Sequence, residues 1–256
     1  MPREQLEEQR IAMWSVPRAL STAMLRAWES RSDTAVLDEP FYGCFLKETG
    51  ADRPGREESL AMMETDSAAV VADLQGPIPD GKSIWFQKHH SLHLLPTTPR
   101  EWMDGMAHFL LIRHPSLVAA SYHRIRPDMT AHDLGWRELA EVHDLLSART
   151  GQAPPILDAS DLLSDPESHL EALCEALGVP FDPGMLAWPS GRRATDPSLG
   201  DPWYATVQTS TGFIADEERK HASETPEDTE AMQQVVDACL PFYEQLHAKR
   251  LTTSGS

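Results

Sequence analysis

The chain has 256 residues, of which 41% are hydrophobic, and its formal net charge at pH 7 is −18. The apolar segments are spread evenly, so we expect one domain over residues 1–250 and a disordered tail over residues 251–256. So acidic a chain argues against binding nucleic acid or an anionic membrane, and an anionic ligand would need a local cluster of cations.

Short apolar runs alternate with helical patterns along the chain. The runs predict strands over residues 11–14, 34–37, 83–87, 108–112 and 155–157. Helices are predicted over residues 20–30, 59–74, 116–124, 134–150 and 162–177, with Gly178 as a C-cap, and a final helix starts at Thr225. Residues 50–58 and 188–212 are long irregular segments, which are often functional. The alternation predicts a single α/β domain in three layers, with a central parallel sheet of about five strands flanked by helices.

Charged or hydroxyl-bearing side chains follow every predicted strand. In chain order these segments are Pro17-Arg18, Asp38-Glu39, Lys88-His89-His90, Arg113-His114 and Asp158-Ala159-Ser160-Asp161. In a parallel α/β sheet the carboxyl ends of the strands share one edge, and ligands bind there. We therefore expect an active site along this edge.

The turn after the first strand is suited to binding an anion. A strand that turns sharply into a helix leaves unpaired N–H groups at the positive end of the helix dipole. Arg18, Ser21 and Thr22 add one cation and two hydroxyls to this turn, and the combination suits a phosphate or a sulfate. Taken alone, the turn is equally typical of an ordinary connection in which Ser21 and Thr22 cap the helix.

Arg113 and Ser121 form a second cation–hydroxyl pair. Ser121 lies eight residues after Arg113 in a predicted helix, where it can lie near the strand end that carries the arginine. An arginine fork donates two hydrogen bonds to phosphate oxygens, and a hydroxyl adds a neutral donor. Arg192 and Arg193, in the second irregular segment, would supply further positive charge. Two anion sites suggest a ligand with two separated phosphate groups, although surface ion pairs are the commoner fate of such arginines.

The usual nucleotide-binding loop is absent. The Walker pattern G-x-x-x-x-G-K-[ST] requires two glycines, whereas this turn has none, and Arg18 precedes the hydroxyls. Only Asp38 and Asp158 stand where an acid would hold magnesium. ATP-type chemistry is therefore less favoured, and a divergent P-loop kinase or NTPase stays as an alternative, as does a non-catalytic nucleotide-binding domain.

Three segments resemble PAPS-dependent sulfotransferases in their order and spacing. The segment Pro17-Arg18-Ala19-Leu20-Ser21-Thr22 resembles that family's 5′-phosphosulfate loop, commonly P-K-S-G-T-T, with arginine in place of the usual lysine. The segment from Arg113 to Tyr122 resembles the 3′-phosphate motif R-x-P-x-x-x-x-x-S-Y. The segment Asp161-Leu162-Leu163-Ser164-Asp165-Pro166, followed by Leu177-Gly178, is similar to the downstream pattern E-D-L-x-x-D-P…F-L-G.

The resemblance implies a P-loop-like fold and a donor, 3′-phosphoadenosine-5′-phosphosulfate (PAPS). Its sulfuryl group would pass in line, without a metal ion, to a hydroxyl or amine of a small-molecule acceptor, leaving 3′-phosphoadenosine-5′-phosphate (PAP). The residues that the resemblance assigns to the 5′-phosphosulfate are Pro17, Arg18, Ala19, Leu20, Ser21, Thr22 and Ala23. Arg113 and Ser121 would hold the 3′-phosphate, and Arg192 and Arg193 would correspond to a late basic loop whose usual glycine is missing here.

The resemblance leaves two candidates for the general base. In one branch of the family a K-x-H sequence supplies a histidine, which corresponds to His90 after Lys88. A histidine pKa of about 6.5 suits this role at neutral pH. In another branch a glutamate after the second strand is the base, which corresponds to Glu39, and it would need burial to raise its pKa. We favour Glu39 and keep His90, while Arg18 or Lys88 would stabilise charge on the leaving 5′-phosphate.

Several aromatic and histidine residues are candidates for either the acceptor pocket or the core and surface. The aromatic residues that would line an acceptor pocket, but that are equally typical of a core, are Phe41, Tyr42, Trp136, Trp203 and Tyr204. His93, His108, His114 and His123 are expected to be structural or surface residues. The protein partner that we expect is a second copy of the chain, in a homodimer.

Cysteine usage and the N-terminal sequence indicate the compartment. Cys44, Cys174 and Cys239 lie far apart without the spacing of metal ligands, which is typical of reduced thiols. Residues 1–10 are charged and have no apolar core of a signal peptide, and no run approaches the about 18 apolar residues of a membrane span. We therefore expect a cytoplasmic protein.

Overall fold

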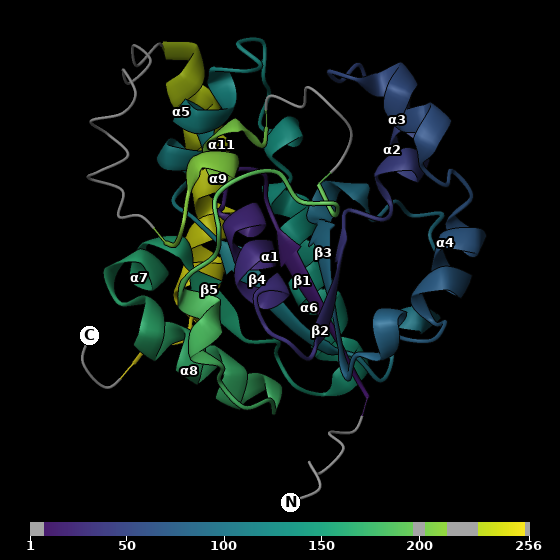
Figure 1. Ribbon diagram of the computed structural model, residues 1–256. Helices are drawn as coiled ribbons and strands as arrows, with labels where there is room; N and C mark the ends of the chain where they lie inside the picture. The colour runs from purple at the N-terminus through teal and green to yellow at the C-terminus, as the bar shows by residue number, and fades with distance from the viewer. Residues whose placement is uncertain (1–7, 197–202, 214–229, 254–256) are drawn as a thin grey trace, which may run out of the picture.

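A computed structural model describes residues 8–196, 203–213 and 230–253 of the chain (Figure 1). Five parallel strands form one sheet in the order β2-β3-β1-β4-β5. The strands are β1 (Gln9–Ser15), β2 (Thr34–Asp38), β3 (Ile84–His90), β4 (Ala107–Ile112) and β5 (Ile156–Asp158). The five strands and the α/β class predicted from the sequence are confirmed.

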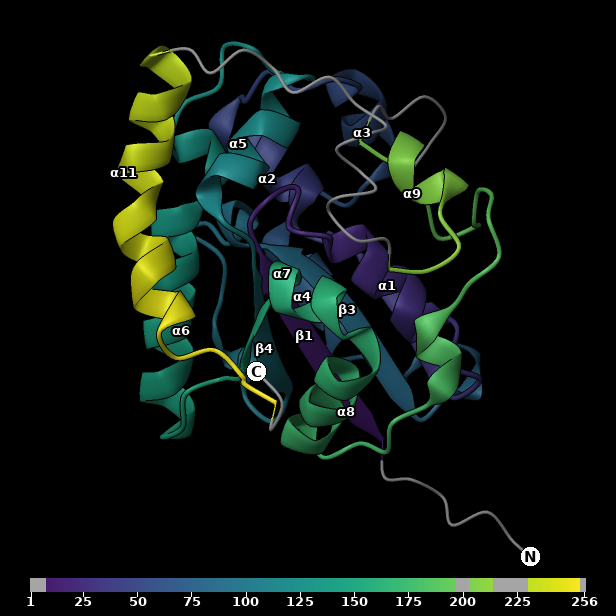
Figure 2. The ribbon, with the colours of Figure 1, turned by 90° about the vertical axis from the view of Figure 1, so that its left-hand side faces the viewer.

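Helices cover both faces of this sheet. They are α1 (Ser21–Glu29), α2 (Tyr42–Thr49), α3 (Arg56–Met62), α4 (Ser67–Leu74), α5 (Pro115–His123), α6 (Trp136–Thr150), α7 (Ala159–Ser164), α8 (Pro166–Leu177), α9 (Ala205–Thr209) and α11 (Glu230–His247). Figure 2 shows α6 and α11 on one side of the sheet and α1 on the other. Because helices shield the central strand from both sides, residues 11–15 of β1 are all buried, and the strand is a continuous apolar run rather than an alternating one.

Two helices that the apolar periodicity predicted as continuous are each broken in two. The predicted helix over residues 59–74 is interrupted because Met63 is extended (φ −101°, ψ 150°) and Asp66 caps α4 by accepting a hydrogen bond from the amide of Ala68. The predicted helix over residues 162–177 breaks at Asp165 (φ −149°, ψ 83°), which caps α8, and Pro166 follows in its first turn. An aspartate at the N-cap and a proline at the first helical position are start signals that a periodicity argument overlooks.

Smaller corrections concern segment boundaries. Lys88, His89 and His90 lie inside β3 rather than after it, and Asp38 and Asp158 are the last residues of their strands. The irregular segments predicted at residues 50–58 and 188–212 include the start of α3 and all of α9. Thr225, where the final helix was predicted to start, lies outside the described residues. Gly178 is confirmed as a left-handed C-cap, with φ 73°.

The C-terminal end of the described chain forms a hydrogen bond with the sheet. Leu251, the first residue of the tail predicted to be disordered, donates its backbone N–H to the carbonyl of Ile156 at 2.7 Å, so this residue adds a contact at β5. Residues 254–256 of that tail lie outside the described part of the chain. No helix within residues 8–196, 203–213 and 230–253 is long and apolar enough to cross a membrane.

The strand registers bring the predicted site residues to one edge. Ser15 at the end of β1 pairs with His90 on one side and Leu111 on the other. Asp38 of β2 pairs with Lys88 of β3. Since all strands are parallel, their carboxyl ends lie together, and the edge predicted to hold the active site is built from loops after β1, β2 and β4 and from the end of β3.

Candidate active site

The turn from β1 into α1 has an unusual backbone. Arg18 (φ 61°) and Leu20 (φ 68°) both adopt left-handed conformations, although neither is a glycine. Such conformations cost free energy for residues with a Cβ atom and concentrate at functional sites. Leu20, the N-cap of α1, has no side-chain oxygen with which to cap the helix, and its first turn holds no acidic residue. The N-terminal amides and the positive dipole end of α1 are therefore suited to an anionic ligand.

The two predicted anion sites meet at Arg18. Its Nε atom donates to the Ser121 hydroxyl at 3.0 Å, and its guanidinium also donates to the Trp203 carbonyl at 2.9 Å. The guanidinium of Arg113, in turn, donates to the Arg18 carbonyl at 3.1 Å. The residues predicted from two separate motifs thus form one connected cluster at the N-terminus of α1.

This cluster encloses a small cavity of about 80 Å³. Its lining residues come from the turn into α1 and the start of that helix, from the residue after β4 and from α5, and from the segment around α9. They are Arg18, Leu20, Ser21, Thr22, Ala23, Arg113, Ser121, Trp203, Thr206 and Val207. The arginines and hydroxyls in this lining are donors of the kind that bind a phosphate group. Seven of the predicted cofactor-binding residues line this cavity, and two more, Pro17 and Ala19, belong to the same turn.

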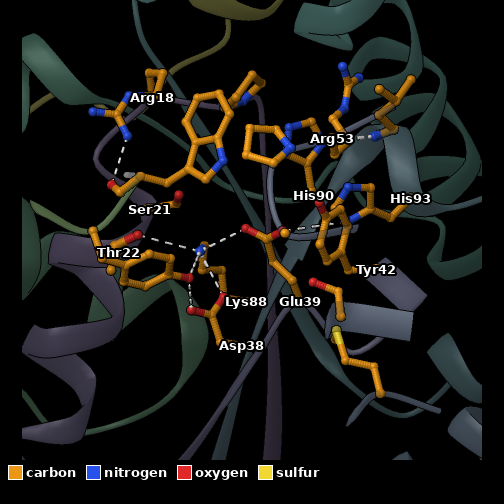
Figure 3. Close-up of a pocket in the computed structure, with 18 of the residues that line it drawn as sticks. Arg18, Ser21, Thr22, Asp38, Glu39, Tyr42, Arg53, Lys88, His90 and His93 are labelled. Atoms are coloured by element: carbon orange, nitrogen blue, oxygen red, sulfur yellow. Dashed lines mark hydrogen bonds and ion pairs between the residues drawn. The ribbon is translucent and has the colours of Figure 1, made fainter. Parts of the chain in front are cut away.

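Lys88 lies between two carboxylates at the centre of the sheet edge (Figure 3). Its ammonium is 2.7 Å from Asp38 Oδ1 and 2.8 Å from Glu39 Oε1. It also lies 3.4 Å from the hydroxyls of Thr22 and Tyr204. The side chains of Lys88 and Asp38 are 4% and 7% exposed, and that of Glu39 is 25% exposed. Lys88 is thereby held beside the first turn of α1, with Glu39 the most accessible member of the group.

The pKa of Glu39 contradicts one expectation from the sequence. We expected burial to raise this pKa and so to make Glu39 a stronger base. Burial does act in that direction, but attraction to Lys88, and to His93 and His90, outweighs it and lowers the pKa of Glu39 to about 2. Burial raises the pKa of Asp38 despite the same lysine, and the two carboxylates together raise the pKa of Lys88 although its own burial opposes this. Lys88 is therefore charged and Glu39 ionised at neutral pH.

The hydrogen bonding of His90 disfavours it as a base. Burial lowers the pKa of His90 to about 4, so the ring is neutral at pH 7. Its Nδ1 atom accepts a hydrogen bond from the backbone N–H of Leu92 at 3.2 Å. A neutral imidazole has one lone-pair nitrogen, so Nδ1 is the acceptor and the proton is on Nε2. His90 can therefore donate a hydrogen bond into the site, but its lone pair is already engaged.

His93 was expected to be structural or on the surface, and it instead faces the site. Its Nδ1 atom is 3.6 Å from Glu39 Oε2, and its ring stacks on that of His90 with centroids 4.7 Å apart. Burial lowers the pKa of His93 well below its usual value, so this ring is also neutral at pH 7. The two oxygens of Glu39 consequently face different neighbours, Lys88 on one side and His93 on the other.

A larger cavity of about 410 Å³ opens beside Lys88. Its lining includes many of the candidate residues from the sequence. They are Pro17, Arg18, Ser21, Thr22, Asp38, Glu39, Tyr42, Lys88, His90, Trp203 and Tyr204. Of the other aromatic candidates, Phe41 and Trp136 are instead buried in the hydrophobic core.

Sequence reasoning missed one ion pair in the wall of this cavity. Arg53, just before α3, lies 2.7 Å from the carboxylate of Asp133, just before α6, and both residues line the larger cavity. The two are 80 residues apart, and neither belongs to a recognisable motif. Only the packing of the loops against each other reveals the pair.

Arg192 and Arg193 are not brought to either cavity. The Arg193 guanidinium lies 3.2 Å from Glu29, the last residue of α1, and its backbone N–H donates to Asp196. Asp196 in turn forms a buried ion pair with Arg26. The loop that contains Arg193 and Asp196 therefore binds to the C-terminal end of α1. This end lies about 12 Å along the helix from the first turn. A role for Arg192 and Arg193 in binding the cofactor stays a prediction.

The site gathers donors for anions. Within the described part of the chain, no group of three or more histidine, cysteine or acidic side chains is arranged to hold a metal. Arg18, Arg113, Lys88 and three hydroxyls instead gather at the N-terminus of α1. This donor set fits a ligand that carries two negatively charged groups.

Similarity to known proteins identifies the family. A model of the sulfotransferase domain matches residues 9–250. Two proteins of Arabidopsis thaliana, named branched-chain-amino-acid aminotransferase-like proteins 2 and 1, are each 39% identical, over 91% and 81% of this chain. The chain spans only 40% and 37% of their lengths.

A solved structure, the sulfotransferase domain of the Synechococcus PCC 7002 olefin synthase, has a similar fold. Its TM-score is 0.53 at 20% identity, and the match covers 93% of this chain and 97% of that domain. The α/β architecture with a five-stranded parallel sheet is therefore that of a sulfotransferase domain, and the chain belongs to the sulfotransferase domain family.

Proposed function

We propose that the protein transfers the sulfuryl group of PAPS to a hydroxyl or amine of a small molecule, without a metal ion. One observation carries the proposal: Arg18, Ser121 and Arg113 form one hydrogen-bonded cluster at the N-terminus of α1, directly beside the buried Lys88. PAPS carries a 3′-phosphate and a 5′-phosphosulfate, and such a cluster can bind both. Membership of the sulfotransferase family supports the same donor.

The residues divide between the two ends of the donor. Arg113 and Ser121, which line the smaller cavity, would hold the 3′-phosphate. The first-turn amides of α1, with the hydroxyls of Ser21 and Thr22, would hold the 5′-phosphosulfate. Arg18 lines both cavities, so its guanidinium would bridge the two ends.

Lys88 and Glu39 would carry the transfer itself. The bond from the sulfuryl sulfur to the 5′-phosphate oxygen breaks as a bond from the acceptor oxygen or nitrogen forms, and the acceptor proton goes to Glu39. Lys88 stabilises the negative charge that grows on the leaving 5′-phosphate. As the lysine charge turns toward that phosphate, Glu39 loses its counter-ion, and its burial then acts to raise its pKa. Glu39 would thus become a base only once the donor is bound.

The acceptor would occupy the larger cavity. Its volume of about 410 Å³ lies within the usual range of small-molecule sites, about 300–1,000 Å³. Glu39, Tyr42 and His93 line the side of the cavity away from the first turn of α1 (Figure 3). A small hydroxyl- or amine-bearing molecule could place its reacting atom against Glu39 in this space.

Thermal shift with nucleotides tests the donor. In buffer containing EDTA, PAP should raise the melting temperature, and it should do so more than ADP, which lacks the 3′-phosphate. Equal shifts for the two nucleotides, or no shift, would count against a PAPS site. ATP turnover that strictly requires magnesium would instead favour a P-loop NTPase. Binding of PAP without transfer to any member of a broad acceptor panel would indicate a non-catalytic nucleotide-binding domain.

A further inference from the structure

Tyr204 comes from a distant part of the chain and contacts Asp38 and Lys88. It directly precedes α9, yet it is only 6% exposed, and its side chain lines the larger cavity at the end of β2. Its hydroxyl donates a hydrogen bond to Asp38 Oδ2 and lies 3.4 Å from the ammonium of Lys88. The centroid of its ring is 5.5 Å from the same ammonium. One side chain therefore contacts both partners of the Asp38–Lys88 ion pair.

Asp38 is the member of this group that does no chemistry in the proposed reaction. Three groups face it: Lys88 from β3, Glu39 as its neighbour in the chain, and the hydroxyl of Tyr204. Because burial and the charge of Glu39 both favour the protonated form of Asp38, its negative charge depends on Lys88 and on the tyrosine hydroxyl. If Asp38 became neutral, Lys88 would be left with Glu39 as its one carboxylate partner in this group.

The charge state of Asp38 decides how strongly Lys88 attracts Glu39. With Asp38 ionised, Lys88 lies 2.7 Å from one carboxylate and 2.8 Å from the other, and Thr22 of α1 is near. Glu39 faces His93 and His90 on its other side, and both rings are neutral at pH 7. Losing the charge of Asp38 would therefore bind Lys88 more tightly to Glu39, and this would weaken Glu39 as a base.

We infer that Tyr204 is a positioning residue of the transfer centre, which is formed by Asp38, Glu39 and Lys88. By donating its hydroxyl to Asp38 it keeps Asp38 ionised and Lys88 held between Asp38 and Glu39. This inference rests on the proposed function for its effect on catalysis, but the charge state of Asp38 can be measured without a donor or an acceptor. Trp203, the preceding residue, accepts a hydrogen bond from Arg18 through its carbonyl. The segment before α9 thus contacts both Arg18 of the anion-binding cluster and Asp38 of the transfer centre.

The variant Tyr204→Phe tests the inference because it removes only the hydroxyl and keeps the ring beside Lys88. Protein labelled with ¹³C at aspartate carboxyls would be titrated by NMR, and Asp38 would be assigned by the signal lost in Asp38→Asn. We expect the titration midpoint of Asp38 to rise by about one pH unit in Tyr204→Phe, the equivalent of one hydrogen bond to a charged group. An unchanged midpoint overturns the inference whether or not the protein is a sulfotransferase.

Tyr243→Phe is a matched control. Tyr243 is also buried, and its hydroxyl lies 3.2 Å from Oδ2 of an aspartate at the end of a strand, Asp158 of β5. It lines neither cavity. This variant should lose stability as Tyr204→Phe does, but it should leave the Asp38 titration and the transfer rate unchanged. A similar loss of rate in both variants would show that Tyr204 is merely structural and would overturn the inference.

Kinetics separate this inference from the proposed function. With PAPS and an accepted substrate, Tyr204→Phe should lower kcat about tenfold, because one hydrogen bond to a charged group is lost. The KM for PAPS should stay within about twofold, since the hydroxyl bonds Asp38 and lies beside Lys88, on the transfer side of the site. As the pH is lowered, kcat of the variant should begin to fall at a higher pH than kcat of the wild type. A wild type that transfers no sulfuryl group contradicts the proposed function, while the NMR titration still decides the role of Tyr204.

Discussion

The guanidinium of Arg18 donates a hydrogen bond to the hydroxyl of Ser121 at 3.0 Å, although 103 residues separate the two in the chain. Arg18 belongs to the turn after β1, and Ser121 belongs to α5, which follows β4. Strands β1 and β4 are neighbours in the sheet, so the loops at their carboxyl ends must meet. Two motifs that suggested separate anion sites are thus parts of one site.

Removing the hydroxyl of Ser121 should weaken nucleotide binding. In Ser121→Ala the proposed 3′-phosphate site loses one donor and Arg18 loses one partner, so we expect the Kd for PAP to rise about tenfold. Isothermal titration calorimetry in EDTA measures this, with ADP as the comparison ligand, whose affinity should change little. Ser147→Ala on α6 is the control, because that hydroxyl bonds only a carbonyl of its own helix, His143. Equal weakening of PAP and ADP would contradict a 3′-phosphate role for Ser121.

Replacing Lys88 separates its structural role from its catalytic one. Lys88→Met leaves the buried Asp38 and the partly exposed Glu39 without their cation. Breaking a buried ion pair typically costs about 3–5 kcal/mol, so the melting temperature should fall. The double variant Lys88→Met/Asp38→Asn removes one of these charges and should recover part of the loss. Both variants should lose about 10²–10³ in kcat, the usual effect of removing one donor from a developing oxyanion. Recovery of kcat together with stability would contradict a catalytic role for Lys88.

Glu39 and His90 differ in what their substitution should do. Glu39→Gln removes the proposed base without changing its size, and we expect kcat to fall at least about 100-fold. His90→Gln should lower kcat by less than about tenfold, because the lone pair of His90 already accepts from Leu92. Single-turnover rates with PAPS and an accepted substrate compare the two. If His90→Gln has the larger effect, His90 is the base; if neither lowers kcat tenfold, both assignments are wrong.

Stability should fall in acid because a buried histidine is held neutral. Burial, chiefly, and the nearby His108 lower the pKa of His89 to about 3, while its unfolded value is about 6.5. The unfolded state therefore binds the proton first, and stability contributed by His89 is complete above pH 6.5 and lost as the pH falls toward 3. Glu39, with its pKa lowered to about 2, loses its contribution only below the unfolded value of 4.5. Between pH 6.5 and 4.5, Glu39 therefore adds nothing to the loss of stability that His89 causes.

The variants His89→Gln and His132→Gln make this a controlled test. His132→Gln, at a histidine whose imidazole is 73% exposed, is the control for replacing a histidine outside the core. His89→Gln should flatten the slope, since the group that takes up the proton on unfolding is gone. Scanning calorimetry across this window supplies both slopes. Identical slopes for the wild type and His89→Gln would contradict the assignment.

The sheet and its active edge could be predicted because buried parallel strands are short apolar runs, and because polar residues such as Arg18 and Arg113 directly follow them. The breaks at Met63 and Asp165 were missed, since an apolar periodicity continues across them. The charge balance around Lys88 could not be predicted at all. It depends on Tyr204, 116 residues away in the chain, and on the distances from the Lys88 ammonium to Asp38 and to Glu39, which no sequence pattern encodes.

If one site binds PAPS and transfers its sulfuryl group with Lys88 beside the leaving phosphate, PAP should be released when an acceptor is present. The most direct test measures the release of PAP from PAPS in EDTA, with and without each member of a panel of small hydroxyl and amine compounds. We expect release that depends on at least one acceptor, persists without magnesium, and falls about 10²–10³-fold in Lys88→Met. Acceptor-independent release, a strict need for magnesium, or full activity in Lys88→Met would contradict it.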